Sequence, residues 1–253
     1  MNMNSAQVGI DRIIRLGWLD KTARFVLAGN DKDAINDMLQ ALLEGHLSGG
    51  KPGVRGSREK TITVLMKTWL TVPERLKALR DDGLKLLQTL PEKNRIAVQW
   101  GMMMASYPFW GVVAEHTGRL LRLQGTAAAS HIQRRVREQC GERQTVSRSA
   151  QRTLRSFVDW GVLGETRQKG LYSLGDNYQV EERELVVWMA EAFLHASANG
   201  SGAIEDILNS PSIFPFQLDP IPPQQLSSSP RLDVLRHGLD DNLVMLRQWR
   251  GDT

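Results

Sequence analysis

The chain has 253 residues, enough for one large domain or two of moderate size. Hydrophobic residues make up 41% and charged residues 24%, a composition that excludes collagen, wholesale disorder and a coiled coil. The single cysteine, Cys140, excludes an intrachain disulfide and a thiolate zinc cage, and it favours a reducing cytoplasm as the location of the protein.

The first part of the sequence predicts helices and one basic loop. The first 17 residues lack a continuous apolar stretch and a small-residue cleavage site, so we expect no signal peptide. Residues 32–44 carry apolar side chains at helical spacing between a capping Asp31 and a terminating Gly45. Residues 46–60 contain four glycines among basic residues, but they lack the GxxxxGK[ST] spacing and a preceding strand. We therefore predict a mobile basic loop there and not a phosphate-binding loop.

Helical spacing resumes at Thr61 and continues to residue 124. Pro73 and Pro91 each stand where a new helix begins, since proline is tolerated in the first turn. Residues 96–114 form an uncharged stretch of 19 residues, long enough for a bilayer span, but polar residues and a proline at 108 interrupt it and leucine is absent. A buried helix broken at this proline is favoured over a membrane span. Residues 1–124 are thus predicted to form an all-α bundle.

The positive charge is concentrated in the middle of the chain. Residues 119–155 contain nine basic and two acidic residues, and all nine basic residues are arginine. Residues 156–253 contain seven basic and 14 acidic residues. Because the planar guanidinium group suits phosphates and guanine edges, the arginine block is a candidate for nucleic-acid binding. The alternative interpretation is a solvated helical surface.

The order of elements in residues 126–174 is the basis of the functional prediction. Residues 126–140 are predicted to form a helix, followed by a turn and a second helix over 145–160. In this second helix the apolar residues recur at spacings of four, four and three, and the basic residues fall on the opposite face. The apolar stripe consists of Val146, Ala150, Leu154 and Phe157, and the opposite face of Arg148, Gln151, Arg152 and Arg155. Gly161 ends the helix, and VLGET and LYSL are predicted to be the two strands of a hairpin.

This succession resembles a winged helix-turn-helix domain over residues 125–175. The sequence that carries the resemblance is TVSRSAQRTLRSFVDWGVLGETRQKGLYSL. The resemblance implies that the helix over 145–160 enters the major groove, that the hairpin is the wing, and that Tyr172 packs under it. The expected nucleic-acid-binding residues are Arg134, Arg135, Arg143, Arg148, Gln151, Arg152, Arg155, Arg167 and Lys169, the last two in the wing. Double-stranded DNA is favoured over RNA because no RNP-like aromatic strand is present.

After Leu174 the chain becomes acidic, and residues 176–253 are predicted to form a helical extension with a linker. A helix is expected over 177–197. The Pro- and Ser-rich residues 209–230 are expected to form a linker or a strap on the surface. Residues 231–249 are predicted to form a last helix or pair of helices. Three apolar residues of the strap are expected to pack on the body of the protein: Ile213, Phe214 and Phe216.

The sequence contains no recognisable catalytic or metal-binding pattern. The five histidines are scattered, without HExxH or another paired metal spacing. The adjacent pairs Asp81–Asp82 and Glu181–Glu182 point to different helix faces, so they make poor acid–base partners. Cationic neighbours would lower the pKa of Cys140 and make it a redox sensor, although a buried small residue is favoured. We expect a non-enzymatic protein without a cofactor or metal.

A second resemblance concerns the biological context. The helical body, YPFW (107–110), RSFVDWG (155–161) and HGLDD (237–241) are similar to helical accessory proteins of the BrxA type, encoded in bacteriophage-exclusion (BREX) loci. This resemblance implies a cytoplasmic component of a bacterial phage-defence system that contacts double-stranded DNA and other proteins of a defence complex, without a membrane. The alternative is a scaffold that binds proteins through the winged domain and the C-terminal strap.

Overall fold

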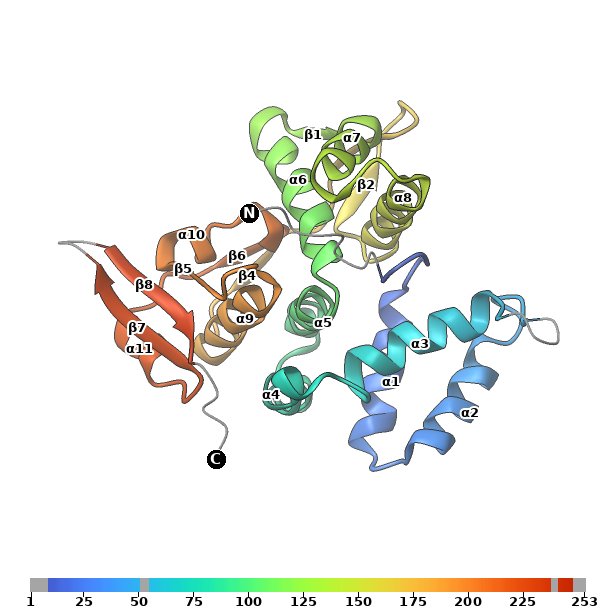
Figure 1. The fold of residues 1–253 in the computed structure, drawn as a ribbon, viewed down its shortest axis with the longest axis horizontal. Helices are drawn as coiled ribbons and strands as arrows, with labels where there is room; N and C mark the ends of the chain where they lie inside the picture. Colours follow the sequence, from blue (N-terminus) through green and yellow to red (C-terminus); the bar gives the residue numbers. More distant parts are fainter. Residues whose placement is uncertain (1–8, 51–54, 238–240, 248–253) are drawn as a thin grey trace.

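The computed structural model describes residues 9–50, 55–237 and 241–247, and these residues are mainly helical, with small sheets of two or three strands (Figure 1). The prediction of a mainly α-helical protein is thus confirmed, and the described residues before 125 contain helices alone as regular structure. These are α1 (Leu16–Leu27), α2 (Lys32–Leu43), α3 (Ser57–Trp69), the 3₁₀ helix η1 (Glu74–Leu76), α4 (Lys77–Thr89), α5 (Glu92–Ser106) and α6 (Pro108–Gln124).

Two local signals in this part have the predicted effect. The Asp31 side chain accepts a hydrogen bond from the backbone N–H of Ala34 at 2.9 Å, so it caps α2. The uncharged stretch 96–114 is divided between α5 and α6, because Pro108 begins a new helix. No helix in the described ranges is both long and apolar enough to cross a bilayer. Residues 51–54 of the predicted basic loop lie outside the described residues.

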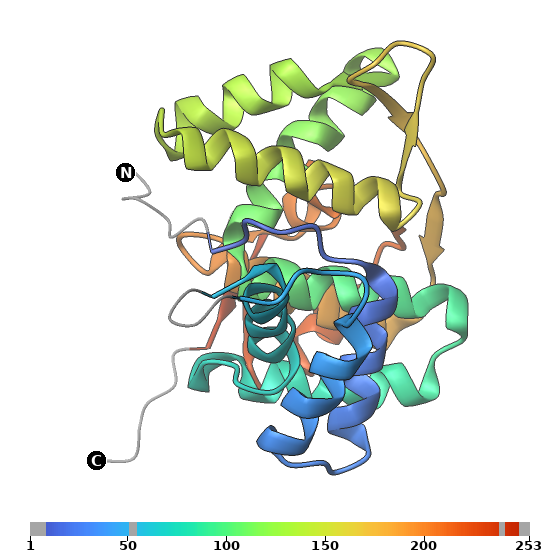
Figure 2. The same cartoon turned by 90° about the vertical axis from the view of Figure 1, so that its right-hand side faces the viewer.

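The middle of the chain combines two helices with a three-stranded antiparallel sheet (Figure 2). Its elements are β1 (Thr126–Ala128), α7 (Ala129–Cys140), α8 (Gln144–Asp159), β2 (Leu163–Glu165) and β3 (Leu171–Leu174). The hairpin strands expected at VLGET and LYSL are present as β2 and β3, paired in the register Leu163↔Leu174. The prediction that residues 126–128 are helical is wrong, since Thr126 pairs with Ser173 and makes β3 the central strand.

The C-terminal part mixes short helices with short strands. Its elements are β4 (Tyr178–Val180), α9 (Arg183–Ala196), β5 (Ser201–Ala203), α10 (Ile204–Leu208), the 3₁₀ helix η2 (Pro211–Ile213), β6 (Phe216–Leu218), α11 (Pro223–Ser227), β7 (Leu232–His237) and β8 (Asp241–Leu246). The strands β4 and β6 pair in parallel, and β5, β8 and β7 form an antiparallel sheet in that order. The helix predicted over 177–197 therefore begins only at Arg183, because residues 178–180 pair with β6.

The predicted last helix or helix pair over 231–249 is wrong for the described residues of that segment. They form the antiparallel hairpin β7–β8 instead. Leu232 and Val244 are fully buried on one face of the sheet, whereas Leu235 on the other face is 52% exposed. Successive side chains of a strand point to opposite faces, so Leu232 and Leu235 lie on different faces of the sheet. Residues 238–240 and 248–249 lie outside the described residues.

An aromatic cluster connects the middle helices to the strap. The ring centroid of Phe157 in α8 lies 4.8 Å from Trp100 in α5 and 4.8 Å from Trp110 in α6. Phe214 of the strap adds a ring 5.4 Å from Trp100. The expected packing of the strap on the body is confirmed, because its three apolar residues are buried. The position of α8 is thus fixed by rings from three other segments.

Candidate nucleic-acid interface

The buried face of α8 is the one that the sequence predicts. Val146, Ala150, Leu154 and Phe157 are all inaccessible to solvent. They lie on one stripe of the helix and pack into the core with α7 and the aromatic cluster. The residues about half a turn away must therefore face outward.

The outward face of α8 carries two arginines and a glutamine. Arg148, Gln151 and Arg155 are exposed, and Arg143, which precedes the first residue of α8, is exposed as well. The side chains of Arg143 and Arg148 have no hydrogen-bond or ion-pair partner among the residues that the structure describes. They are therefore the cations of α8 that are most available to an external anion.

Arg155 is available only in part, because a carboxylate binds it. Its guanidinium group donates a hydrogen bond to Glu165 of β2, and the two side chains form an ion pair. This hydrogen bond raises the pKa of Arg155. The side chain is still 45% exposed, so Arg155 lies at the surface with its charge balanced by the hairpin.

Arg152 lies against a segment that sequence reasoning did not connect with α8. Residues 10–16, here called the N-terminal segment, run alongside the helix (Figure 2). Arg152 donates a hydrogen bond to the backbone oxygen of Asp11, and its Nη1 lies 4.0 Å from the Asp11 carboxylate. Burial lowers the pKa of Arg152, and the nearby Arg12 adds to this effect. Arg152 is thus on the flank of α8 and not on its open face.

The N-terminal segment is attached to α8 by buried contacts. The backbone N–H of Ile14 donates to the Ser156 hydroxyl at 2.8 Å, and the Trp160 indole donates to the backbone oxygen of Ile14 at 2.8 Å. Ile10 and Ile14 are fully buried. The N-terminal segment therefore covers one side of α8.

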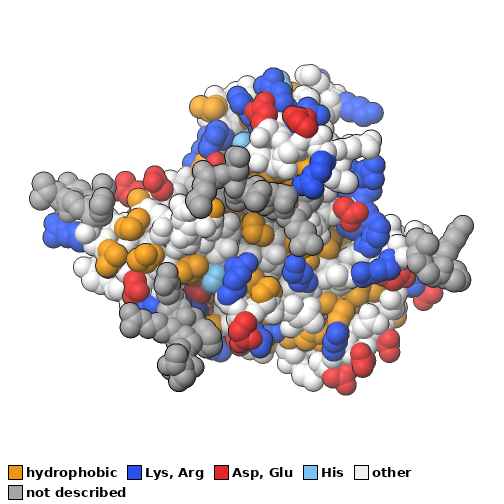
Figure 3. All heavy atoms as spheres, viewed as in Figure 1, with side chains coloured by type: hydrophobic (Ala, Val, Ile, Leu, Met, Phe, Trp, Pro, Cys, Tyr) orange, Lys and Arg blue, Asp and Glu red, His pale blue; other side chains and the backbone are white. Residues whose placement is uncertain are grey.

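The remaining predicted contacts lie on α7 and in the hairpin loop. Arg134 and Arg135 are exposed, but both form ion pairs with Glu138, at 3.8 and 3.1 Å. Arg167 and Lys169 are exposed in the loop between β2 and β3, which projects beyond the sheet in Figure 1. Figure 3 shows Lys and Arg side chains gathered over this upper part of the molecule, with some acidic side chains among them.

Two further side chains near α8, Tyr172 and Cys140, are buried. Tyr172 is buried on β3, one of the two strands of the hairpin. The expectation of a lowered pKa for Cys140 is wrong, since burial raises the pKa of its thiol more than Arg143 lowers it. The favoured interpretation of Cys140 as a buried residue is confirmed.

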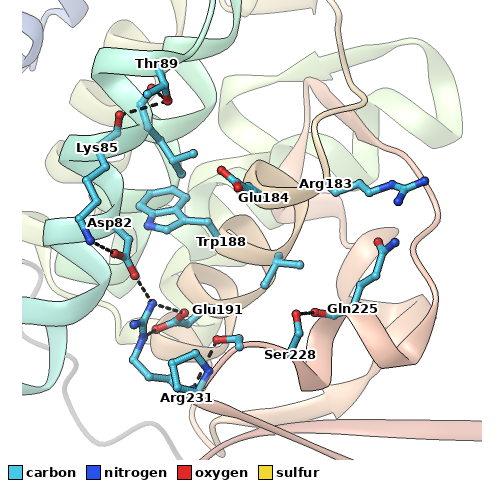
Figure 4. Close-up of a pocket in the computed structure, with 14 residues that line it drawn as sticks. Asp82, Lys85, Thr89, Arg183, Glu184, Trp188, Glu191, Gln225, Ser228 and Arg231 are labelled. Carbon is cyan, nitrogen blue, oxygen red and sulfur yellow. Dashed lines mark hydrogen bonds and ion pairs between the residues drawn. The ribbon is translucent and has the colours of Figure 1, made fainter.

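A separate cavity of about 520 Å³ lies between α4, α9 and the segment that joins α11 to β7 (Figure 4). In this cavity Arg231 binds the carboxylates of Glu191 and Asp82. Sequence reasoning missed this network. The sequence signal that could have indicated a buried charge is Glu191, an acidic residue inside the apolar stripe of α9. No group of three or more metal-ligating side chains occurs in the described parts of the chain.

Comparisons of the chain with protein-family models, with curated proteins and with solved structures each give no match. Function is therefore inferred from the arrangement and charge of residues 125–175.

Proposed function

We propose that the protein binds double-stranded DNA, with residues 125–175 acting as a winged helix-turn-helix domain. The succession of α7, a turn, α8 and the β2–β3 hairpin supports this assignment, and β1 holds the hairpin against the end of α6. In this proposal α8 enters the major groove and the β2–β3 loop contacts the backbone.

The observation that carries the proposal is the division of α8 into a buried apolar face and an open polar face. Arg143 and Arg148 supply unpaired guanidinium groups for phosphates, which fix the position of a protein on the duplex. Gln151 supplies an amide that can bind adenine through two hydrogen bonds. The charge pairs of Arg134 and Arg135 with Glu138 are exposed and weak, so a phosphate can displace the carboxylate.

The proposal includes a non-enzymatic role in bacterial phage defence, as an accessory protein of the BrxA type that acts with other proteins of a defence complex. The scaffold alternative depends on a strap that binds partners, and the apolar residues of the strap are buried in the protein itself. The buried strap favours DNA binding over the scaffold. Affinity purification from the host, with and without nuclease, distinguishes the two: a complex that survives nuclease treatment favours the scaffold.

The test is the affinity of the purified protein for a labelled mixed-sequence duplex, measured by fluorescence anisotropy at several salt concentrations. The double variant Arg143→Ala/Arg148→Ala should bind more weakly, with a log–log salt slope smaller by about 1.8, because each lost phosphate contact removes about 0.9. Arg183→Ala is the matched control, since Arg183 is an exposed arginine on α9 without a partner among the described residues. Single-stranded DNA and RNA serve as competitors.

Equal binding by the wild type and the double variant, with unchanged circular dichroism, would show that α8 is not the contact surface. A salt slope near zero for the wild type would contradict an electrostatic interface altogether.

A further inference from the structure

Carboxylates lie beside two arginines of α8, but only Arg155 forms a close ion pair. The Asp11 carboxylate lies 3.1 Å from Arg12 and 4.0 Å from Arg152. Glu165, from β2, pairs with Arg155, and Asp11, from the N-terminal segment, lies beside Arg152. Both carboxylates are about half exposed, 59% for Glu165 and 51% for Asp11. They therefore lie at the border of the surface that we assign to DNA.

Both acidic residues are also anchored by their backbone. Asp11 lies between Ile10 and Ile14, which are fully buried, so its backbone cannot move away from α8 without exposing them. Glu165 is paired in the sheet with Tyr172, which is buried. The backbone of both acidic residues is thus anchored beside the arginine face.

From this arrangement we propose that Asp11 and Glu165 are specificity-determining residues that limit the affinity of α8 for duplexes of any sequence. The inference rests on the proposed DNA-binding function. A phosphate that approaches Arg155 must replace the Glu165 carboxylate, and one that approaches Arg152 must come close to the Asp11 carboxylate, which has a like charge. A larger share of the contacts between α8 and DNA then comes from the unpaired side chains of Arg143, Arg148 and Gln151.

The two carboxylates should weaken sequence-independent binding to phosphates relative to sequence-dependent binding to base edges. Contacts to phosphates release counterions and are independent of sequence, whereas the hydrogen bonds of Gln151 to a base edge depend on sequence. The two carboxylates weaken the contacts of Arg152 and Arg155 with phosphates and leave the hydrogen bonds of Gln151 to a base edge unchanged. Discrimination between a target and random DNA is therefore larger than an unrestrained arginine face would give.

The experiment compares Asp11→Asn, Glu165→Gln and the double variant with the wild type on a mixed-sequence duplex. Glu165→Gln should tighten binding and steepen the log–log salt slope by about 0.9, because it frees Arg155. For one recovered phosphate contact, that slope means that the gain in affinity falls about threefold when salt rises from 50 to 200 mM. Asp11→Asn should act in the same direction with a smaller change of slope, because Arg152 keeps its hydrogen bond to the backbone oxygen of residue 11. Asp81→Asn is the matched control, because this exposed aspartate pairs with Arg80 on α4 and has the same charge change.

The possible results separate the inference from the function on which it rests. If the control tightens binding as much as the other variants, net charge alone is responsible and the inference fails. If the variants bind as the wild type does, or more tightly with an unchanged slope, the inference fails and the proposed function stands. If no protein in the set binds the duplex, the proposed function fails together with the inference. Thermal unfolding of each variant confirms that it is folded.

Discussion

Replacement of Arg231 by methionine tests the charge network beside the cavity. The guanidinium group binds both oxygens of Glu191, with Nε–Oε1 at 2.6 Å and Nη2–Oε2 at 3.0 Å, and Nη2 also lies 2.7 Å from Asp82 (Figure 4). Glu191 is only 1% exposed. Arg231→Met keeps an aliphatic side chain but leaves this carboxylate in the interior, with His195 at 3.8 Å as its remaining ion-pair neighbour in the described residues.

The loss of stability follows from the burial of Glu191. Removal of one partner of a buried ion pair costs about 3–5 kcal/mol, because the other charge is left without compensation. Asp82 is one-third exposed, so the loss of its ion pair with Arg231 adds at most about 1 kcal/mol to the loss of stability after solvent screening. In a protein of this size a loss of 3–5 kcal/mol lowers the melting temperature by about 6–20 °C. Urea unfolding followed by tryptophan fluorescence measures the free energy, since the chain has seven tryptophans.

The pH dependence of the same variant gives an independent check. In the wild type, burial is the largest effect on the pKa of Glu191 and raises it, but hydrogen bonds from His195 and Arg231 outweigh burial and lower the pKa. A lowered folded-state pKa contributes stability that is present above the usual value of 4.5 and is lost as the pH falls through the folded pKa. Without Arg231, burial prevails and the pKa rises, so the sign reverses and mild acid should stabilise the variant.

The difference in stability between wild type and variant should therefore shrink when the pH falls from 7 to 5. If Arg231→Met lowers the free energy of unfolding by less than about 1 kcal/mol at pH 7, the Arg231–Glu191 pair contributes no more than a surface ion pair, and the predicted cost of burial is wrong. A difference that stays constant over this pH range would refute the reasoning as well. The double variant Arg231→Met/Glu191→Gln should recover part of the loss, because it buries no unpaired charge.

Three further predictions concern packing, capping and reactivity. Gly101→Ala places a Cβ 2.4 Å from the Trp188 ring, so we expect a loss of about 1–3 kcal/mol in urea unfolding, whereas Gly17→Ala, with open space around its Cβ, should be neutral or slightly stabilising. Asp31→Ala removes the cap of α2 and should cost about 1 kcal/mol in the same assay. Cys140, buried and with a raised pKa, should react slowly with a thiol reagent until denaturant is added; fast reaction of the folded protein would contradict its burial.

The helical spacing of α8 could be predicted from the sequence because the signal is local. Residues 146, 150, 154 and 157 lie within three turns, and burial follows from their order alone. The partners of the arginines could not be predicted in this way. Asp11 and Arg152 are 141 residues apart, and no periodic pattern relates them. The Arg231–Glu191 pair could not be predicted for the same reason, because the two residues are 40 positions apart.

The errors in secondary structure have a related cause. Residues 126–128 are rich in alanine, which favours a helix, yet they form a strand because β3 pairs with them. The apolar residues of β7 and β8 are too few to separate a short strand from a short helix by periodicity. In both places the partner strand determines the conformation, and local propensity gives the wrong answer.

The contact between Ile14 and Ser156 also sets an order of events during synthesis. The two residues are 142 positions apart, so at 5–20 residues per second the ribosome needs about 7–30 s to make α8 after it has made the N-terminal segment. During that time Ile10 and Ile14 lack the partner that later buries them. The N-terminal segment is thus made before α8 and docks only after α8 has been made, and the flank of the proposed DNA-binding helix is completed at that stage.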